Sequence, residues 1–136
     1  MRVIIWLSNM NNTNLHWKLD KSERASLLEQ FPPIWPDIYA HHVTCGLSDG
    51  ARLSDVETGL IVGIVNDGNG VQALVIEING TVHRPDGSLF HITWSLDRSS
   101  GRKPVDSNDV LKHLVWDRID PPVAIKLFAN IGSGQS

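Results

Sequence analysis

The segment between residues 60 and 78 limits the possible folds more than any other part of the chain. Two apolar runs, 60–65 and 71–78, are separated by the stretch 66–70, which contains both Asp-Gly and Asn-Gly. These dipeptides tolerate the positive φ angles that tight hairpin turns require. The sequence therefore predicts an antiparallel β-hairpin here, and a protein in which antiparallel sheet is the main structural element.

Further apolar runs predict additional strands, and polar stretches predict loops between them. We expect strands over residues 2–8, 39–47, 89–96 and 123–128. The Asn-rich stretch 9–20 and the polar stretch 48–58 are expected to be loops. Pro121-Pro122 is expected to break the chain before the last strand, because proline lacks the N–H that a ladder needs.

Two short helices are also expected. Residues 22–30 form the first, with Asp20 or Ser22 as its cap and a proline-rich segment, 32–36, after its end. Residues 105–114 form the second, with Asp106 or Ser107 as its cap. The predicted fold class is α+β, with mainly antiparallel sheets in a compact bilobal arrangement.

Composition limits the functions that such a fold can have. The chain has 136 residues, 41% hydrophobic and 20% charged, which favours a single folded domain, here 1–131, with a loose tail over 132–136. A net charge of −3 argues against binding of long duplex nucleic acid, and no apolar run is long enough to span a bilayer. The one cysteine, Cys45, cannot form an internal disulfide. We expect a cytoplasmic monomer without a membrane partner.

The tripeptide His-x-Thr occurs twice, each time in a predicted strand, at 42–44 and at 91–93. Residues i and i+2 of a strand point to the same face, so each copy places an imidazole beside a hydroxyl. Random placement of the histidines and threonines gives roughly 0.2 such tripeptides in a chain of this composition. Two copies that face one cavity would supply the groups needed to cleave a phosphodiester without a metal.

These residues resemble the two-histidine (2H) phosphoesterase superfamily, also called LigT-like, which is marked by two copies of His-Φ-(Ser/Thr)-Φ with Φ apolar. The copies here are 42–45 and 91–94, and the resemblance covers residues 39–96 by motif. It implies a bilobal α+β fold with the motifs facing each other across a groove. It also implies activity on 2′–5′ linkages, on 2′,3′-cyclic phosphates of RNA ends or small nucleotides, or on nucleotide second messengers. The motif histidines are 49 positions apart, which is shorter than usual for the family.

The chemistry expected of the two motifs is general acid–base catalysis. One of His42 and His91 takes a proton from water or a substrate hydroxyl, and the other protonates the departing oxygen. Thr44 and Thr93 donate hydrogen bonds to the non-bridging oxygens. The sequence leaves open which histidine is the base, and it predicts no cofactor and no metal. The expected substrate is a small nucleotide or an RNA end.

Four further residues are predicted to contact the substrate. Tyr39 and Trp94 would stack on a nucleobase, although strand alternation also places Trp94 opposite to His91. Arg102 and Lys103, in a small basic loop after the second motif, would contact phosphate.

The sequence leaves three alternatives open. The first is a metal site built from His42, His91 and a third ligand, for which no familiar ligand spacing is present. The second is nucleophilic catalysis by Cys45, whose position in the strand turns its thiol away from His42. The third is a domain that binds and sequesters a cyclic nucleotide without cleaving it.

Overall fold

The computed structural model describes residues 14–46, 53 and 55–132. Within these residues the fold is α+β, with two α-helices and mostly antiparallel strands, so the predicted fold class is confirmed at this level. The elements in chain order are β1 (Asn14–Leu19), α2 (Lys21–Gln30), β2 (Asp37–Ile38), β3 (His42–Gly46), β4 (Thr58–Asn66), β5 (Val71–Glu77), β6 (His91–Leu96), the 3-10 helix η2 (Arg98–Ser100), α3 (Asp106–His113) and β7 (Asp117–Gly132).

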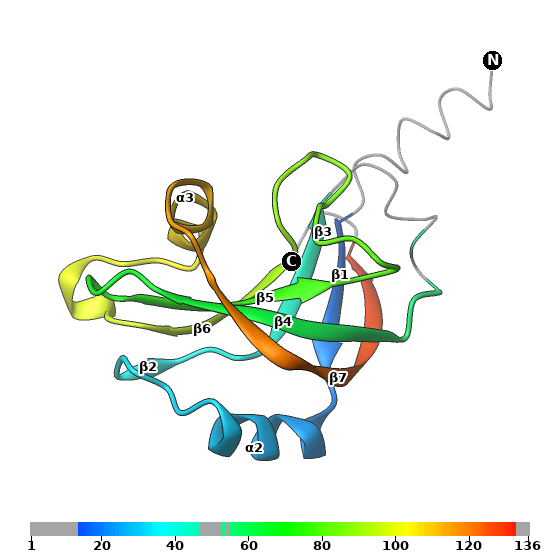
Figure 1. The fold of residues 1–136 in the computed structure, drawn as a ribbon, viewed down its shortest axis with the longest axis horizontal. Coiled ribbons are helices and arrows are strands. Elements are labelled where there is room, and N and C mark those ends of the chain that lie inside the picture. Colours follow the sequence, from blue (N-terminus) through cyan, green and yellow to red (C-terminus); the bar gives the residue numbers. More distant parts are fainter. Residues whose placement is uncertain (1–13, 47–52, 54, 133–136) are drawn as a thin grey trace.

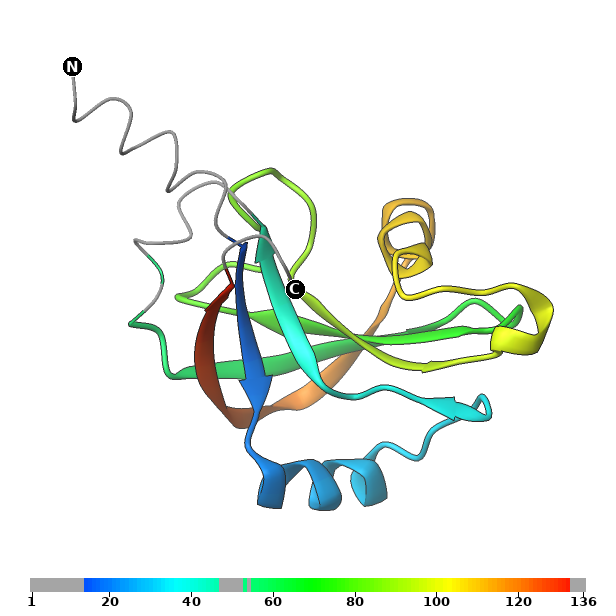
Figure 2. The same cartoon turned by 180° about the vertical axis from the view of Figure 1, so that it is seen from behind.

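The strands form one seven-stranded sheet in the order β2-β6-β5-β4-β7-β1-β3. Every pair of neighbours in the sheet is antiparallel. Figures 1 and 2 show that the sheet is strongly curled, with α3 over one of its faces and α2 across the lower opening of the curl. The curl brings the two ends of the strand order close to one another. One end consists of β2 and β6, and the other end is β3.

A backbone turn at Ala40 joins the two ends of the sheet. The N–H groups of Tyr39 and Ala40 donate to the carbonyls of Trp94 and Thr93, both at 2.9 Å, so this segment continues the pairing of β2 with β6. The chain then leaves β6, and the N–H of Leu19 in β1 donates to the His41 carbonyl. Ala40 has a φ of 51°, a left-handed conformation that lets one chain switch between the two strands. The first motif strand therefore begins directly beside the second.

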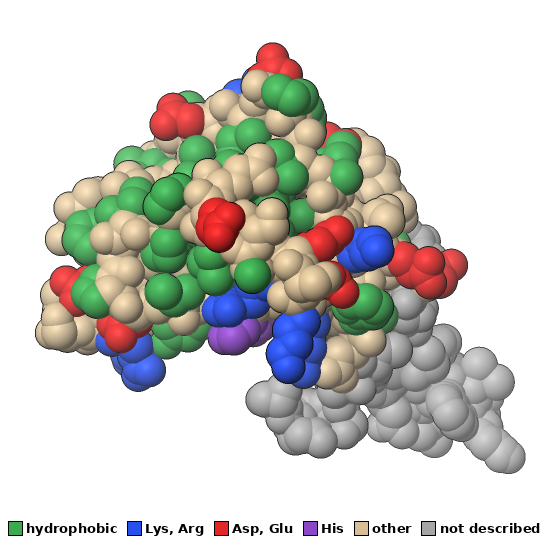
Figure 3. Space-filling view, turned by 90° about the horizontal axis from the view of Figure 1, so that it is seen from below, with side chains coloured by type: hydrophobic (Ala, Val, Ile, Leu, Met, Phe, Trp, Pro, Cys, Tyr) green, Lys and Arg blue, Asp and Glu red, His purple; other side chains and the backbone are tan. Residues whose placement is uncertain are grey.

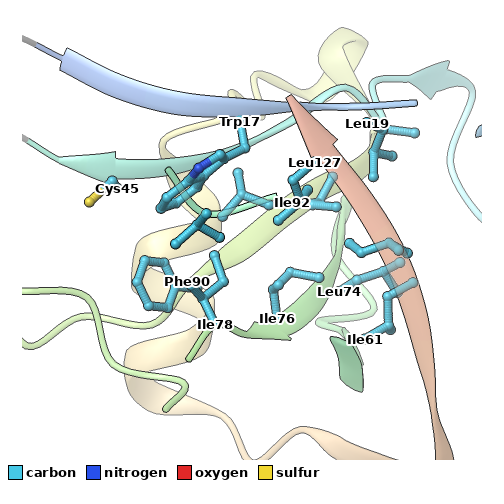
Figure 4. Packing of buried hydrophobic residues seen from close by; sticks show 14 of the residues in the cluster. Trp17, Leu19, Cys45, Ile61, Leu74, Ile76, Ile78, Phe90, Ile92 and Leu127 are labelled. Atoms are coloured by element: carbon cyan, nitrogen blue, oxygen red, sulfur yellow. The ribbon is translucent and has the colours of Figure 1, made fainter. Parts of the chain in front are cut away.

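The inner face of the curl holds the larger hydrophobic core. Its largest fully buried side chains include Trp17, Trp94 and Phe90, and Leu27 of α2 closes it from below. Figure 4 shows aliphatic side chains from β4, β5, β6 and β7 in the same core as Trp17 and Phe90. The apolar members of both motif strands point into this core. Alternation therefore turns the histidines and threonines of both motifs to the opposite face.

A second core lies on that opposite face, between the sheet and α3. Val110 and Leu111 of α3 pack on small and branched residues of β4 and β5, among them Val62, Ala73 and Val75. The packing of α3 places its first turn next to the outer face of β6, where the second motif lies.

The structure confirms the elements that the sequence marks most strongly. The hairpin of β4 and β5 turns at 66–70, where Asp67 accepts hydrogen bonds from the backbone N–H groups of Asn69 and Val71 at 2.8 and 2.9 Å. Asp20 caps α2 by accepting from the Glu23 N–H at 3.0 Å. The predicted cap of α3 is wrong, because the helix begins without a side-chain cap and Asp106 accepts from the Lys103 N–H instead.

The expected loop over 9–20 is wrong for its second half, where β1 lies. The apolar residues Leu15, Trp17 and Leu19 alternate with polar ones and are all buried. The strand is held between β3 and β7, both distant in sequence, so its stability comes from pairing that the local polar composition hides. The expected strand over 2–8 lies outside the described residues.

Pro121-Pro122 does not break the chain, because β7 runs through both prolines. The register between β4 and β7 shifts at this point: Ile61 faces Val123, but Gly63 already faces Arg118. The prolines fall within the extra residues of this irregularity, where no ladder N–H is required of them. The strand reaches Gly132, the first residue of the expected tail, and the remaining tail residues lie outside the described part.

No helix among the described residues has the length and apolar character needed to cross a membrane. Figure 3 shows apolar side chains spread over the lower face of the molecule, between acidic and basic ones.

Candidate active site

Both His-x-Thr motifs open onto the same cavity, which has a volume of about 340 Å³. His42 and Thr44 of β3 line it together with His91 and Thr93 of β6. The remaining lining residues are Tyr39, His41, Arg84, Pro104, Val105 and Asn108. Two motifs far apart in the chain thus contribute imidazole and hydroxyl groups to one space, next to the first turn of α3.

The position of the first motif depends on a contact from α2. The Arg24 side chain donates through Nε to the Ala40 carbonyl at 2.7 Å and through Nη2 to the Tyr39 carbonyl at 2.9 Å. These two carbonyls flank the left-handed turn that sends the chain from β6 to β1. Arg24 therefore holds the segment that sets where His42 begins its strand.

His91 is a largely buried imidazole, with 8% of its surface exposed. Its Nδ1 lies 2.9 Å from the Leu89 carbonyl, which can only accept, so Nδ1 carries a proton and Nε2 is the basic atom of the neutral ring. Burial lowers the pKa of His91; the hydrogen bond to Leu89 offsets part of this effect and the charge of Arg84 adds to it. His91 is therefore a neutral proton acceptor at neutral pH.

His42 is an exposed imidazole beside other basic groups. Its ring centroid lies 5.2 Å from that of His16 on β1. Partial desolvation lowers the pKa of His42, and nearby basic groups lower it further. These groups are His16, His41, His91 and Lys18. A bound phosphate would oppose this effect, because a negative charge favours the protonated ring.

The two threonines are held differently. The Thr93 hydroxyl donates to the Pro104 carbonyl at 3.3 Å and lies 2.9 Å from the hydroxyl of Ser107, which is fully buried in α3. Thr44 makes no side-chain hydrogen bond to any part of the chain that the structure describes. Thr44 is therefore the freer hydroxyl donor for a ligand, and Thr93 also ties the cavity wall to the helix.

Arg84 lines the cavity, although no sequence pattern predicts it. Its guanidinium pairs with Asp86, with Nη2 and Nε at 2.9 and 3.4 Å from the carboxylate oxygens, and its side chain is 12% exposed. This pairing holds the pKa of Asp86 well below its usual range. Arg84 lies in the connection between β5 and β6, where strand alternation gives no prediction of side-chain direction. The one signal in the sequence that could have identified it is its closeness to His91. Arg84 presents to the cavity a cation that is always ionised, and the carboxylate of Asp86, which does not line this cavity, partly offsets its charge.

Of the four predicted substrate contacts, only Tyr39 lines the cavity. Trp94 is fully buried in the inner core, where its Nε1 donates to the Phe31 carbonyl at 2.7 Å, so its prediction as a stacking residue is wrong. Its place in the strand, opposite to His91, is the physical reason.

The predicted phosphate contacts of Arg102 and Lys103 are also wrong for this cavity. Arg102 pairs with Asp67 at 2.7 Å, so it binds the β4–β5 turn instead. Lys103 is exposed and does not line the cavity, although the two residues after it do.

Strand alternation has different outcomes at the two neighbours of this motif. Cys45 is buried against the inner core, as the alternation predicts, and so points away from the cavity. Regular alternation would turn His41 to the face opposite His42, but His41 lines the same cavity, because the turn at Ala40 interrupts the strand before it.

Among the residues that the structure describes, no three His, Cys, Asp or Glu side chains are grouped so that they could hold a metal ion. No family model, curated protein or solved structure matches the chain. The geometry of the cavity is therefore the basis on which a function can be inferred.

Proposed function

We propose that the protein is a two-histidine phosphodiesterase, which hydrolyses a cyclic or 2′–5′ phosphodiester of a nucleotide or an RNA end without a metal. The observation that carries the proposal is the meeting of both His-x-Thr motifs and Arg84 at one cavity. Chance placement of two such motifs gives no reason for them to share a cavity with a half-buried cation.

The surroundings of the histidines support separate roles for them. His91 is the general base, because its buried ring is neutral and its tautomer leaves Nε2 free to take a proton from the attacking water. The water oxygen forms a bond to phosphorus as the bond between phosphorus and the leaving oxygen breaks. His42 is the general acid, protonated when the phosphate anion binds beside it, and it transfers that proton to the leaving oxygen.

The remaining polar groups stabilise the negative charge that develops on the non-bridging oxygens. Arg84 supplies a guanidinium whose charge is partly offset by its partner Asp86, and Thr44 supplies a hydroxyl that can donate to the phosphate. Tyr39, which also lines the cavity, would contact the sugar or base.

The topology is compatible with a reduced LigT-like arrangement, which we include in the proposal. The strands β1 and β3 with the second part of β7 form one lobe, and β2, β4, β5 and β6 form the other. β7 belongs to both, since it pairs with β4 and with β1. Each lobe then contributes one motif strand.

The test is hydrolysis of 2′,3′-cyclic AMP, a 2′–5′ linked diadenylate and cyclic dinucleotides in excess EDTA. We expect turnover by the wild type, and a loss of about 10²- to 10⁴-fold in kcat/KM for His42→Ala and for His91→Ala. His113→Ala is the matched control, because His113 is exposed on α3 and its Nδ1 lies 3.0 Å from the Asp109 carbonyl of the same helix.

Either alanine variant retaining the wild-type rate would contradict the proposed roles. Tight binding of these nucleotides without any product would instead favour a sequestering domain that uses the same cavity.

A further inference from the structure

A second and larger cavity adjoins the active site. It has a volume of about 630 Å³ and lies between α3 and the connection that joins β5 to β6. Arg84 and Asn108 line both cavities, so the two spaces meet at these side chains. We call this second cavity the α3 groove.

The size of the active-site cavity shows why the α3 groove matters. Ligand pockets typically have about 300–1,000 Å³, and the active-site cavity, about 340 Å³, lies at the lower limit. A volume of this size suits a phosphate with one nucleoside, so a second nucleoside must extend beyond it. The groove on the far side of Arg84 is the larger adjoining space.

The walls of the α3 groove suit a nucleoside better than a second phosphate. Leu89 and Leu111 provide apolar surface, while Asn108, Asp109 and Lys112 provide hydrogen-bonding groups of both kinds. Two acidic side chains, Asp86 and Asp109, and two basic ones, Arg84 and Lys112, line the groove, so their charges balance. Apolar faces with a polar edge match the faces and edges of a base, whereas a phosphate requires an excess of positive charge.

We propose that the α3 groove binds the nucleoside on one side of the scissile phosphate, so that the preferred substrate is a phosphodiester with a nucleoside on both sides. This inference rests on the proposed function, because it takes the scissile phosphate to lie beside Arg84. A dinucleotide or longer oligonucleotide, linear or cyclic, fills both cavities, and a mononucleoside 2′,3′-cyclic phosphate fills only the smaller one.

Calorimetric binding in EDTA tests the inference apart from catalysis. The two probes are the deoxydinucleotide d(ApA) and the methyl ester of deoxyadenosine 5′-monophosphate. Both are phosphodiesters with one negative charge, and they differ in the second nucleoside. We expect the wild type to bind d(ApA) at least about tenfold more tightly than the methyl ester, a difference equivalent to one well-made polar contact.

Lys112→Trp fills the groove from an exposed position on α3, and Lys21→Trp on α2 is the control. We expect Lys112→Trp to reduce the preference for d(ApA) to within about twofold, and Lys21→Trp to keep it. If Lys112→Trp does not fold, Asp109→Trp replaces it, since Asp109 is also exposed in the same wall.

The outcomes separate this inference from the proposed function. Equal affinity of the wild type for both probes, or a preference that survives in the filled-groove variant, overturns the inference; continued hydrolysis of 2′,3′-cyclic AMP then leaves the phosphodiesterase proposal standing. A preference that Lys112→Trp removes supports the groove, even if no substrate is hydrolysed and the phosphodiesterase proposal fails. A wild type that neither binds nor hydrolyses these compounds contradicts both.

Discussion

Removing the Arg24 side chain should damage the proposed active site from a distance. Its guanidinium donates to the carbonyls of Tyr39 and Ala40 at 2.9 and 2.7 Å. A hydrogen bond from a charged donor contributes about 1.5–3 kcal/mol, and partial exposure of Arg24 places both bonds at the lower end of that range. Arg24→Ala should therefore lower the free energy of unfolding by about 3 kcal/mol, which for a chain of this length lowers Tm by roughly 10 °C.

The same substitution should reduce catalysis, because the two bonds fix the turn that places His42. A displacement of about 1 Å at a catalytic group can lower the rate by about 10²-fold, so kcat/KM should fall by at least tenfold at a temperature where the variant is folded. Arg24→Lys keeps the charge but not the fork of two donors, and it should lie between Arg24→Ala and the wild type in both measurements.

Denaturant unfolding and steady-state kinetics on the same preparations test this prediction. Arg118→Ala, at an exposed arginine of β7, is the control and should change stability by no more than about 0.5 kcal/mol. Wild-type stability in Arg24→Ala would refute the estimate made from the two hydrogen bonds. A destabilised variant with unchanged kcat/KM would show that Arg24 supports the fold without positioning His42.

Two more predictions concern the buried half of the site. Burial lowers the folded-state pKa of His91. The folded protein therefore favours the neutral ring, and the stability that this ring contributes is present above the ordinary histidine pKa. That stability is lost as the pH falls through the lowered value. In His91→Asn the amide can replace Nδ1 in the hydrogen bond to Leu89. Urea unfolding should show that this variant loses less stability than the wild type between about pH 7 and pH 5. An equal loss would contradict the assignment of His91 as a buried, neutral imidazole. Arg84→Met should raise the pKa of His91 in an NMR titration and lower kcat/KM by about 10²- to 10³-fold; a variant with neither change would remove Arg84 from the site.

Local patterns in the sequence predicted the elements that depend on local structure. The hairpin of β4 and β5 follows from its turn residues, and α2 follows from its Asp20 cap and the prolines after it. β1 was missed because its pairing with β3 and β7 joins distant segments. The continuity of β7 through its prolines was missed because the register shift opposite Gly63 is a property of the pair of strands, and neither strand shows it alone.

The site was predictable to the extent that strand alternation controls it. Alternation placed His91 and Thr93 on one face of β6, and it also warned that Trp94 points to the other. It could not show that the turn at Ala40 brings β3 beside β6, nor that a loop residue, Arg84, completes the cavity. Closeness in sequence was a poor guide for Arg102, whose long side chain reaches a carboxylate on a different turn.

The most direct test of the proposed site follows the histidine ring signals by NMR while adenosine 2′-monophosphate is added. If one phosphate sits between both motifs, the signals of His42 and His91 move with the same dissociation constant, and the pKa of each ring rises on binding because the anion favours its protonated form. The signal of His113, on the exposed face of α3, stays in place. Movement of only one of the two motif histidines, or movement of each with a different dissociation constant, would contradict a shared phosphate site.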